Sequence, residues 1–114
     1  MPQIQDYRFG HIVVDGQSYT RDLIIYPDRV QGNWWRKEGH RLSPDDLPQV
    51  LQAPPEVLVV GQGSPGLMVV PAETRQRLEQ AGITVIVEPT AQAWQTYNRL
   101  RQERRTVAAL HLTC

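Results

Sequence analysis

The carboxyl-terminal quarter, residues 88–114 (EPTAQAWQTYNRLRQERRTVAALHLTC), constrains the fold most, because it predicts a helix that runs directly into a buried strand. Apolar side chains recur in its first half at helical spacing: Ala93, Trp94, Tyr97 and Leu100. This spacing predicts one helix face packed against a core. Thr90 is placed to cap the helix. The following segment, TVAALHLT, predicts a strand that leads to Cys114, the only cysteine.

Strand and helix patterns alternate from Glu56 onward. EVLVVG and ITVIVEP predict two more buried strands, and ETRQRLEQAG between them predicts a helix with Thr74, Leu78 and Ala81 on one side. Gly82 is placed to end that helix. Because strand–helix–strand units form right-handed crossovers, the alternation predicts an α/β fold with a mostly parallel sheet.

The first half of the chain predicts shorter elements. Asp15-Gly16 lies between two extended apolar-rich segments and is typical of a tight turn, so a β-hairpin is expected to open the fold. Residues 23–26 (LIIY) are apolar on both faces, which predicts a strand covered on two sides. Residues 30–35 predict a further short strand. SPDDLPQVLQ predicts one short helix, with Ser43 as N-cap and Pro44 at the first helical position.

Length and composition predict one α/β domain, residues 1–114. A chain of 114 residues, 40% of them hydrophobic, is the size of one compact domain and leaves no room for a second core. The 12 Lys and Arg balance the 12 Asp and Glu, so no overall charge would attract nucleic acid or an anionic membrane. No apolar run approaches the roughly 20 residues that cross a bilayer. The amino terminus has no signal- or transit-peptide pattern, and one cysteine suits a reducing compartment. We therefore expect a cytoplasmic protein.

The segments DLIIYP, WWRKEGHRLSPDDL and EVLVVGQGSPGLMVV, together with the carboxyl-terminal quarter, resemble one family of small domains. The family includes mitochondrial complex I assembly factor 3, the adipogenesis-associated domain protein and many bacterial proteins described as domains of unknown function. The resemblance implies a bacterial member with a three-layer fold and a mixed central sheet. In the mitochondrial branch it implies a role in assembling a respiratory complex.

The first candidate site is the loop GQGSPG, residues 61–66, which follows a predicted strand. Ligands of open α/β sheets bind beyond the carboxyl ends of strands, where free backbone N–H groups can hold an anion. The dinucleotide and P-loop patterns are incomplete, because no glycine opens a helix directly and no Gly-Lys-Ser or Gly-Lys-Thr follows. The alternative is a turn whose glycines serve backbone geometry alone. Gly61, Gly63 and Ser64 are candidate binding residues, and no nucleotide cofactor is expected.

The second candidate site is the segment WWRKEGH, residues 34–40. Indole and guanidinium groups bind acidic or planar partners well. Two adjacent tryptophans in an extended segment point to opposite faces, so we expect one to be buried and one exposed. Trp35, Arg36 and His40 are candidate residues for a ligand or partner, on a surface loop that contributes little to the core. The alternative is a packed loop in which Arg36 pairs with a carboxylate such as Asp46.

His111 and Cys114 form a third candidate, considered as metal ligands. Two ligands are too few for a structural zinc site, which takes four, and His11 and His40 lie on other predicted elements. We therefore expect no metal or other cofactor, with His111 a buried strand residue and Cys114 a small apolar plug. No acid–base pair or Ser-His-Asp set follows from the spacing, so no catalytic residue is assigned.

The leading hypothesis is a non-catalytic binding or assembly-type domain with a protein partner that the sequence does not name. The oligomeric state is equally unassigned. The alternative is a small ligand-binding domain or enzyme that uses a cleft between the Gly61–Gly63 loop and the Trp35-Arg36-His40 loop. A deep pocket joining these loops would favour the alternative, whereas a flat apolar patch at Trp34 or Met68 would favour a partner surface.

Overall fold

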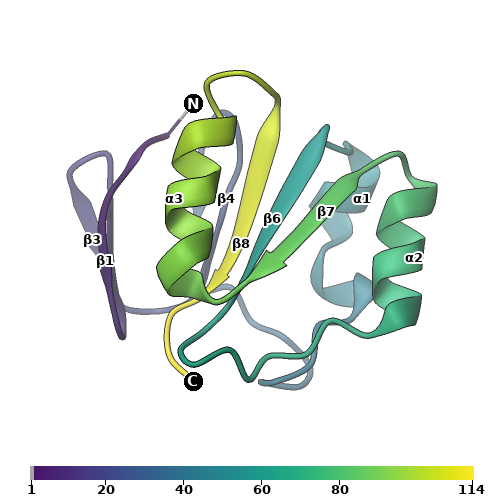
Figure 1. The fold of residues 1–114 in the computed structure, drawn as a ribbon, viewed down its shortest axis with the longest axis horizontal. Coiled ribbons are helices and arrows are strands. Elements are labelled where there is room, and N and C mark those ends of the chain that lie inside the picture. Colours follow the sequence, from purple (N-terminus) through teal and green to yellow (C-terminus); the bar gives the residue numbers. More distant parts are fainter. Residues whose placement is uncertain (1) are drawn as a thin grey trace.

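The structure, a computed structural model, describes residues 2–114. A five-stranded sheet with the order β5-β4-β8-β6-β7 forms its centre (Figure 1). Its strands are β4 (Leu23–Ile25), β5 (Val30–Gln31), β6 (Val57–Gln62), β7 (Thr84–Glu88) and β8 (Thr106–His111). β6 is parallel to both β7 and β8, whereas β4 is antiparallel to both β8 and β5. The expected α/β fold with a mixed central sheet is therefore confirmed.

The parallel pairs follow from two crossover helices. α2 (Ala72–Gln80) connects β6 to β7, and α3 (Thr90–Leu100) connects β7 to β8. A 3₁₀ helix, η1 (Pro44–Asp46), and a short helix, α1 (Pro48–Gln52), precede β6. α3 covers one face of the sheet, and α1 and α2 cover the other (Figure 1). None of the helices formed by residues 2–114 has the length and apolar character needed to cross a membrane.

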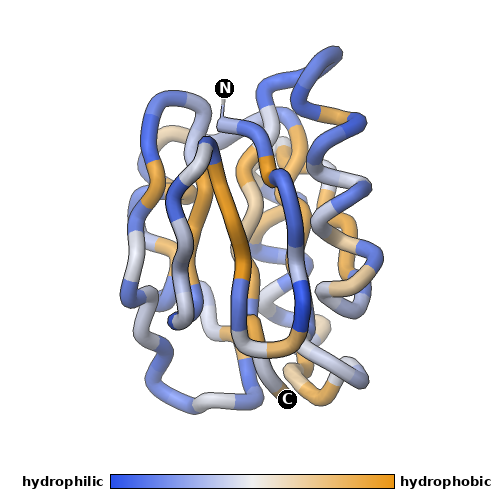
Figure 2. Tube along the Cα trace, turned by 90° about the vertical axis from the view of Figure 1, so that its left-hand side faces the viewer, coloured by the Kyte–Doolittle hydropathy of each residue, from blue (hydrophilic) through white to orange (hydrophobic). Residues whose placement is uncertain are grey.

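The amino-terminal strands form a separate three-stranded antiparallel sheet: β1 (Ile4–Arg8), β2 (His11–Val14) and β3 (Gln17–Tyr19). Asp15 and Gly16 adopt positive φ angles of 48° and 80° between β2 and β3, so the predicted hairpin turn is confirmed. β1 adds a third strand to that hairpin. This sheet faces the viewer in Figure 2, where β1 is mostly hydrophilic and β2 mostly hydrophobic.

Alternate residues of the central strands pack against opposite layers. In β6, Leu58 and Val60 belong to the core beneath α1 and α2, whereas Val57 and Val59 belong to the core shared with α3 and the amino-terminal sheet. This is the two-residue period of a strand. Because both faces are covered, the strand sequences are continuously apolar rather than alternating. The result is the three-layer arrangement that the family resemblance implied.

Two local predictions in the first half are wrong. The segment 43–52 is not one helix. A residue before proline avoids helical backbone angles, and Leu47, which precedes Pro48, adopts φ −128° and ψ 48°. Ser43 nevertheless caps η1 as predicted. The strand expected at residues 30–35 ends at Gln31, since Asn33 has a positive φ of 53°.

Two predictions in the second half are also wrong. β7 is not fully buried, because it is an edge strand in which Thr84 is exposed and Ile86 is partly exposed. Thr90 makes no capping hydrogen bond, and the N-cap of α3 is Pro89. Gly82, with φ 85°, follows α2 as predicted.

Tyr97 anchors α3 to the amino-terminal sheet. Its ring is fully buried, and its hydroxyl donates a 2.6 Å hydrogen bond to the carbonyl of Pro2. Burial raises the pKa of Tyr97 well above its ordinary range, so the hydroxyl stays a donor. The neighbouring Asn98 accepts from the backbone N–H of Ile4 and donates to its carbonyl. Helix and sheet are thereby joined in one core.

Replacing Tyr97 with alanine should lower the free energy of unfolding by about 3–5 kcal/mol, because a buried ring and its hydrogen bond are removed. Tyr97→Phe is the matched control, which keeps the ring and should lose only about 1 kcal/mol. Urea unfolding followed by circular dichroism measures both changes. An unchanged midpoint for Tyr97→Ala would show that α3 is not packed on β1 as described.

Candidate functional site

The Trp34-Trp35-Arg36 segment alternates between the interior and the surface. Trp34 and Arg36 are 5% and 7% exposed, whereas Trp35 between them is 77% exposed. The backbone N–H of Trp34 donates to the carbonyl of Asp22, and its indole Nε1 donates to the carbonyl of Asp46. The expectation of one buried and one exposed tryptophan is confirmed. The exposed indole extends from a backbone that is fixed on both sides.

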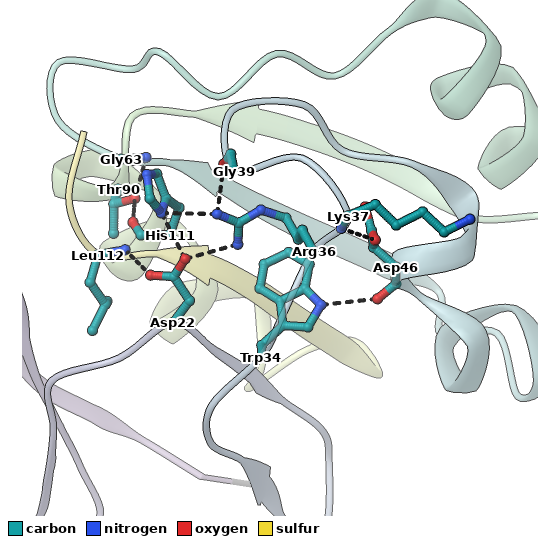
Figure 3. Close-up of polar contacts among 10 residues, drawn as sticks. All are labelled: Asp22, Trp34, Arg36, Lys37, Gly39, Asp46, Gly63, Thr90, His111 and Leu112. Carbon is teal, nitrogen blue, oxygen red and sulfur yellow. Dashed lines mark hydrogen bonds and ion pairs between the residues drawn. The ribbon is translucent and has the colours of Figure 1, made fainter.

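Asp22, immediately before β4, is the centre of a polar cluster that we call the Asp22 cluster: Asp22, Arg36 and His111. Its Oδ2 accepts from Arg36 Nη1 at 2.8 Å and from His111 Nδ1 at 2.7 Å, while Oδ1 accepts from the backbone N–H of Leu112 at 2.8 Å. Arg36 also donates to the carbonyl of Gly39 and stacks over the Trp34 ring (Figure 3). One carboxylate thus joins three separate segments of the chain.

Charge and hydrogen bonding both favour the ionised form of Asp22. Burial alone would raise the pKa of this carboxyl, but the hydrogen bonds from His111, the Leu112 backbone and Arg36 outweigh it, and the pKa is lowered. Since only an N–H can face a carboxylate oxygen at 2.7 Å, His111 Nδ1 carries a proton. His111 Nε2 and Arg36 Nε are buried without a hydrogen-bond partner among residues 2–114.

The glycine loop packs against the other side of His111. A Cβ on Gly63 would lie 2.6 Å from His111 Cδ2 and 2.0 Å from the carbonyl oxygen of Thr113, and Gly63 has a φ of +85°. The Gly63 N–H donates to Thr90 Oγ1, whose hydroxyl donates to the His111 carbonyl. Thr90 therefore links the loop to β8. Only glycine fits here without moving the chain.

The structure brings together most of the residues predicted from the two loops. Arg36 and Gly63 contact His111 from opposite sides, and the His40 ring meets the His111 ring edge-on with centroids 6.0 Å apart. Ser64 follows on the same loop, and its N–H donates to the carbonyl of Thr113.

Gly61 and Trp35 lie apart from that meeting point. Gly61 is buried, and a Cβ there would contact Thr90 and Leu110 at 2.7 and 2.8 Å. The indole of Trp35 is exposed beside an open groove of about 630 Å³ lined by residues 20–22, residues 33–35 and Thr113. That groove is not a cleft between the two loops, because neither Gly63 nor His40 lines it.

Several expectations about side chains are corrected. Arg36 is buried and pairs with Asp22, not Asp46, because Asp46 accepts instead from the backbone N–H groups of Lys37 and Ser43. Arg36 is therefore part of the packed structure. Cys114 is exposed, so it is not an apolar plug. His111 is 6% exposed, which confirms a buried strand residue.

Asp22 is the residue that sequence reasoning missed. It directly precedes the fully apolar LIIY segment, and an acid at the end of a doubly covered strand must find donors when the strand is buried. That signal predicts a partnered carboxylate, although it does not name the partners. No group of three or more His, Cys, Asp and Glu side chains in the described part of the chain is placed to hold a metal ion.

Residues 4–112 match the family described as "Protein of unknown function (DUF498/DUF598)". The chain belongs to this family. The conserved hypothetical protein PH1505 from Pyrococcus horikoshii OT3 is 29% identical, with a TM-score of 0.82 over 98% of this chain and 99% of that one. A protein named MT938 is 27% identical, with a TM-score of 0.82 over the whole of both chains.

The Rpa2829 protein from Rhodopseudomonas palustris is 27% identical, with a TM-score of 0.77 over 95% of this chain and 81% of that one. These similarities confirm the α/β fold and the membership of the DUF498/DUF598 family. The family description names no activity, ligand or partner.

Replacing Arg36 with alanine should lower the free energy of unfolding by about 3 kcal/mol, because Asp22 loses its buried partner. Arg41→Ala is the matched control in the same loop. The Arg41 side chain is 53% exposed and its ion pair with Glu38 spans 3.6 Å, so its loss should change stability by less than about 1 kcal/mol. Urea unfolding compares the two, and equal effects would contradict a structural role for Arg36.

Proposed function

We propose that residues 1–114 act as a single, non-catalytic binding domain that docks a protein partner through Trp35. One observation carries the proposal: Trp35 is 77% exposed while the residues on both sides of it are buried and hydrogen-bonded. Single exposed apolar residues are common on protein surfaces. Trp35 differs from most of them in that its backbone is fixed on both sides. Little conformational entropy is therefore lost when a partner covers its indole.

Tryptophan suits this role energetically. Residues that dominate binding free energy at protein interfaces are enriched in tryptophan, and each can contribute about 2 kcal/mol or more. The groove beside Trp35 exposes hydroxyl, amide and guanidinium groups of Thr20, Asn33 and Arg21, which can form the polar rim of an interface. Trp34 and Met68 are buried and cannot form the apolar patch considered from the sequence.

Other exposed apolar side chains lie on loops that are tied to this region. Leu67 and Val69 are 52% and 53% exposed, and the backbone of Val69 bonds to His40 and Leu42. In this proposal Trp35, His40 and Ser64 touch the partner. Arg36, Gly61 and Gly63 act through structure, since they hold the two loops in place.

The resemblance to complex I assembly factor 3 points to one class of protein partner. By analogy we extend the proposal to a subunit of a respiratory complex as the bound protein, with this domain assisting its assembly. This step rests on analogy at the level of the fold.

A small ligand-binding domain or enzyme is the second candidate, favoured by the Asp22–His111 pair. A histidine oriented by a carboxylate at Nδ1 presents a basic Nε2, which is the arrangement of a general base. In the structure, however, Nε2 is buried, and the glycine loop packs directly on the ring. This candidate therefore requires the glycine loop to move before a substrate could reach Nε2.

Trp35→Ala should weaken partner binding by at least about thirtyfold, equivalent to about 2 kcal/mol, while the thermal midpoint stays unchanged. Affinity purification from the native host identifies the partner, and calorimetry with that purified partner measures the affinity. Trp94→Ala is the control, because Trp94 in α3 packs on the core and its loss should lower stability instead. Equal affinity of wild-type protein and Trp35→Ala would contradict the proposed docking site.

A further inference from the structure

A second cavity, of about 550 Å³, lies at the opposite end of the central sheet from the Asp22 cluster. Its walls come from the turn between β4 and β5, from α1 and from the start of β8. The Asp22 cluster includes His111, the last residue of β8. The cavity is lined instead by Arg105, which precedes β8, and by Val107 near the start of that strand. The two regions therefore share no side chain, and this cavity belongs to no part of the proposed docking site.

Arg29 forms one wall in a fixed orientation. Its guanidinium lies over the Tyr26 ring, 4.2 Å from the centroid, and Nη2 donates to Gln49 Oε1 at 2.5 Å. Nη1 pairs with Asp28 at 2.9 Å, and the backbone of the turn is closed by a bond from the Tyr26 N–H to the Arg29 carbonyl. Stacking and hydrogen bonding together hold a planar set of donors at the cavity wall.

Arg105 also lines the cavity, and its guanidinium forms no ion pair with the side chains of residues 2–114. Its backbone N–H donates to Glu56 Oε2, and its carbonyl accepts from the N–H groups of Glu56 and Val57. The guanidinium makes one long bond, 3.3 Å, from Nη1 to the Pro54 carbonyl. Most of its donors therefore remain available to a ligand.

The cavity lining also includes apolar residues. Tyr26 and Val107, which are 5% and 2% exposed, line the cavity together with Ala53, the residue after α1. Gln52 adds an amide group at the same wall. A cavity of this size, lined by both apolar and polar residues, has the character of a small-molecule site.

We propose that this cavity binds a small organic anion, with its carboxylate or phosphate group held by the guanidinium groups of Arg105 and Arg29. Guanidinium groups bind either anion through paired hydrogen bonds, so the head group shared by both classes is the feature recognised. The proposal does not depend on the partner-binding function, because it involves none of the residues assigned to docking.

Titration of ¹⁵N-labelled protein with benzoate and, separately, with inorganic phosphate tests the proposal by NMR. Chloride at equal ionic strength is the reference for non-specific screening. We expect saturable shifts in the side-chain amides of Gln49 and Gln52 and in the backbone amide of Arg105. A response to benzoate alone would assign the carboxylate class, and a response to phosphate alone would assign the phosphate class.

Arg105→Gln should weaken the binding of the responding anion by about tenfold, whereas Arg104→Gln, an exposed neighbour outside the cavity, should leave it unchanged. Arg29→Gln provides a second test if Arg105→Gln does not fold, as judged from the spectrum of the free variant. The absence of saturable shifts with both anions in the wild-type protein would overturn the proposal. Equal weakening by Arg104→Gln would overturn it as well.

Discussion

The carboxylate of Asp22 joins three segments that are far apart in the sequence. Arg36 lies 14 residues away and His111 lies 89 residues away, yet both bond to the same oxygen, while the Leu112 N–H bonds to the other. A partly buried carboxylate without donors would be strongly destabilising. Because three donors satisfy it, the carboxylate holds the Trp34–His40 loop against the end of β8.

The exposure of Trp35 depends on this arrangement. Arg36 is held by Asp22 and the Gly39 carbonyl, and Trp34 is held by backbone and indole hydrogen bonds, so the residue between them is directed outward. The His111 ring that completes the cluster also fills the space in front of Gly63. The interactions that give the loop its shape therefore also close the cleft that an enzymatic function would need. This coupling is consistent with the proposed partner binding.

Local sequence patterns predicted most of the helices and strands, whereas the site is formed by contacts between residues that are distant in the sequence. The buried strands β6 and β8 follow from their apolar runs, and the turn at Asp15-Gly16 follows from the positive φ angles that this dipeptide adopts readily. The role of Arg36 could not be predicted in the same way, since Asp46 is also an aspartate and is closer in sequence to Arg36 than Asp22 is. The Asp46 carboxylate already accepts hydrogen bonds from two backbone N–H groups, and these contacts are seen only in the folded structure.

Amide hydrogen exchange in Asp22→Ala tests the central role of this carboxylate most directly. Leu112 donates to Asp22, and the neighbouring amides of Gly10 and Ser64 bond to the carbonyls of Leu112 and Thr113. We predict that these three amides lose protection together, and by more than the amide of Val59 in the centre of β6, which reports global unfolding. Equal loss at all four amides, or a loss confined to Leu112, would contradict the account.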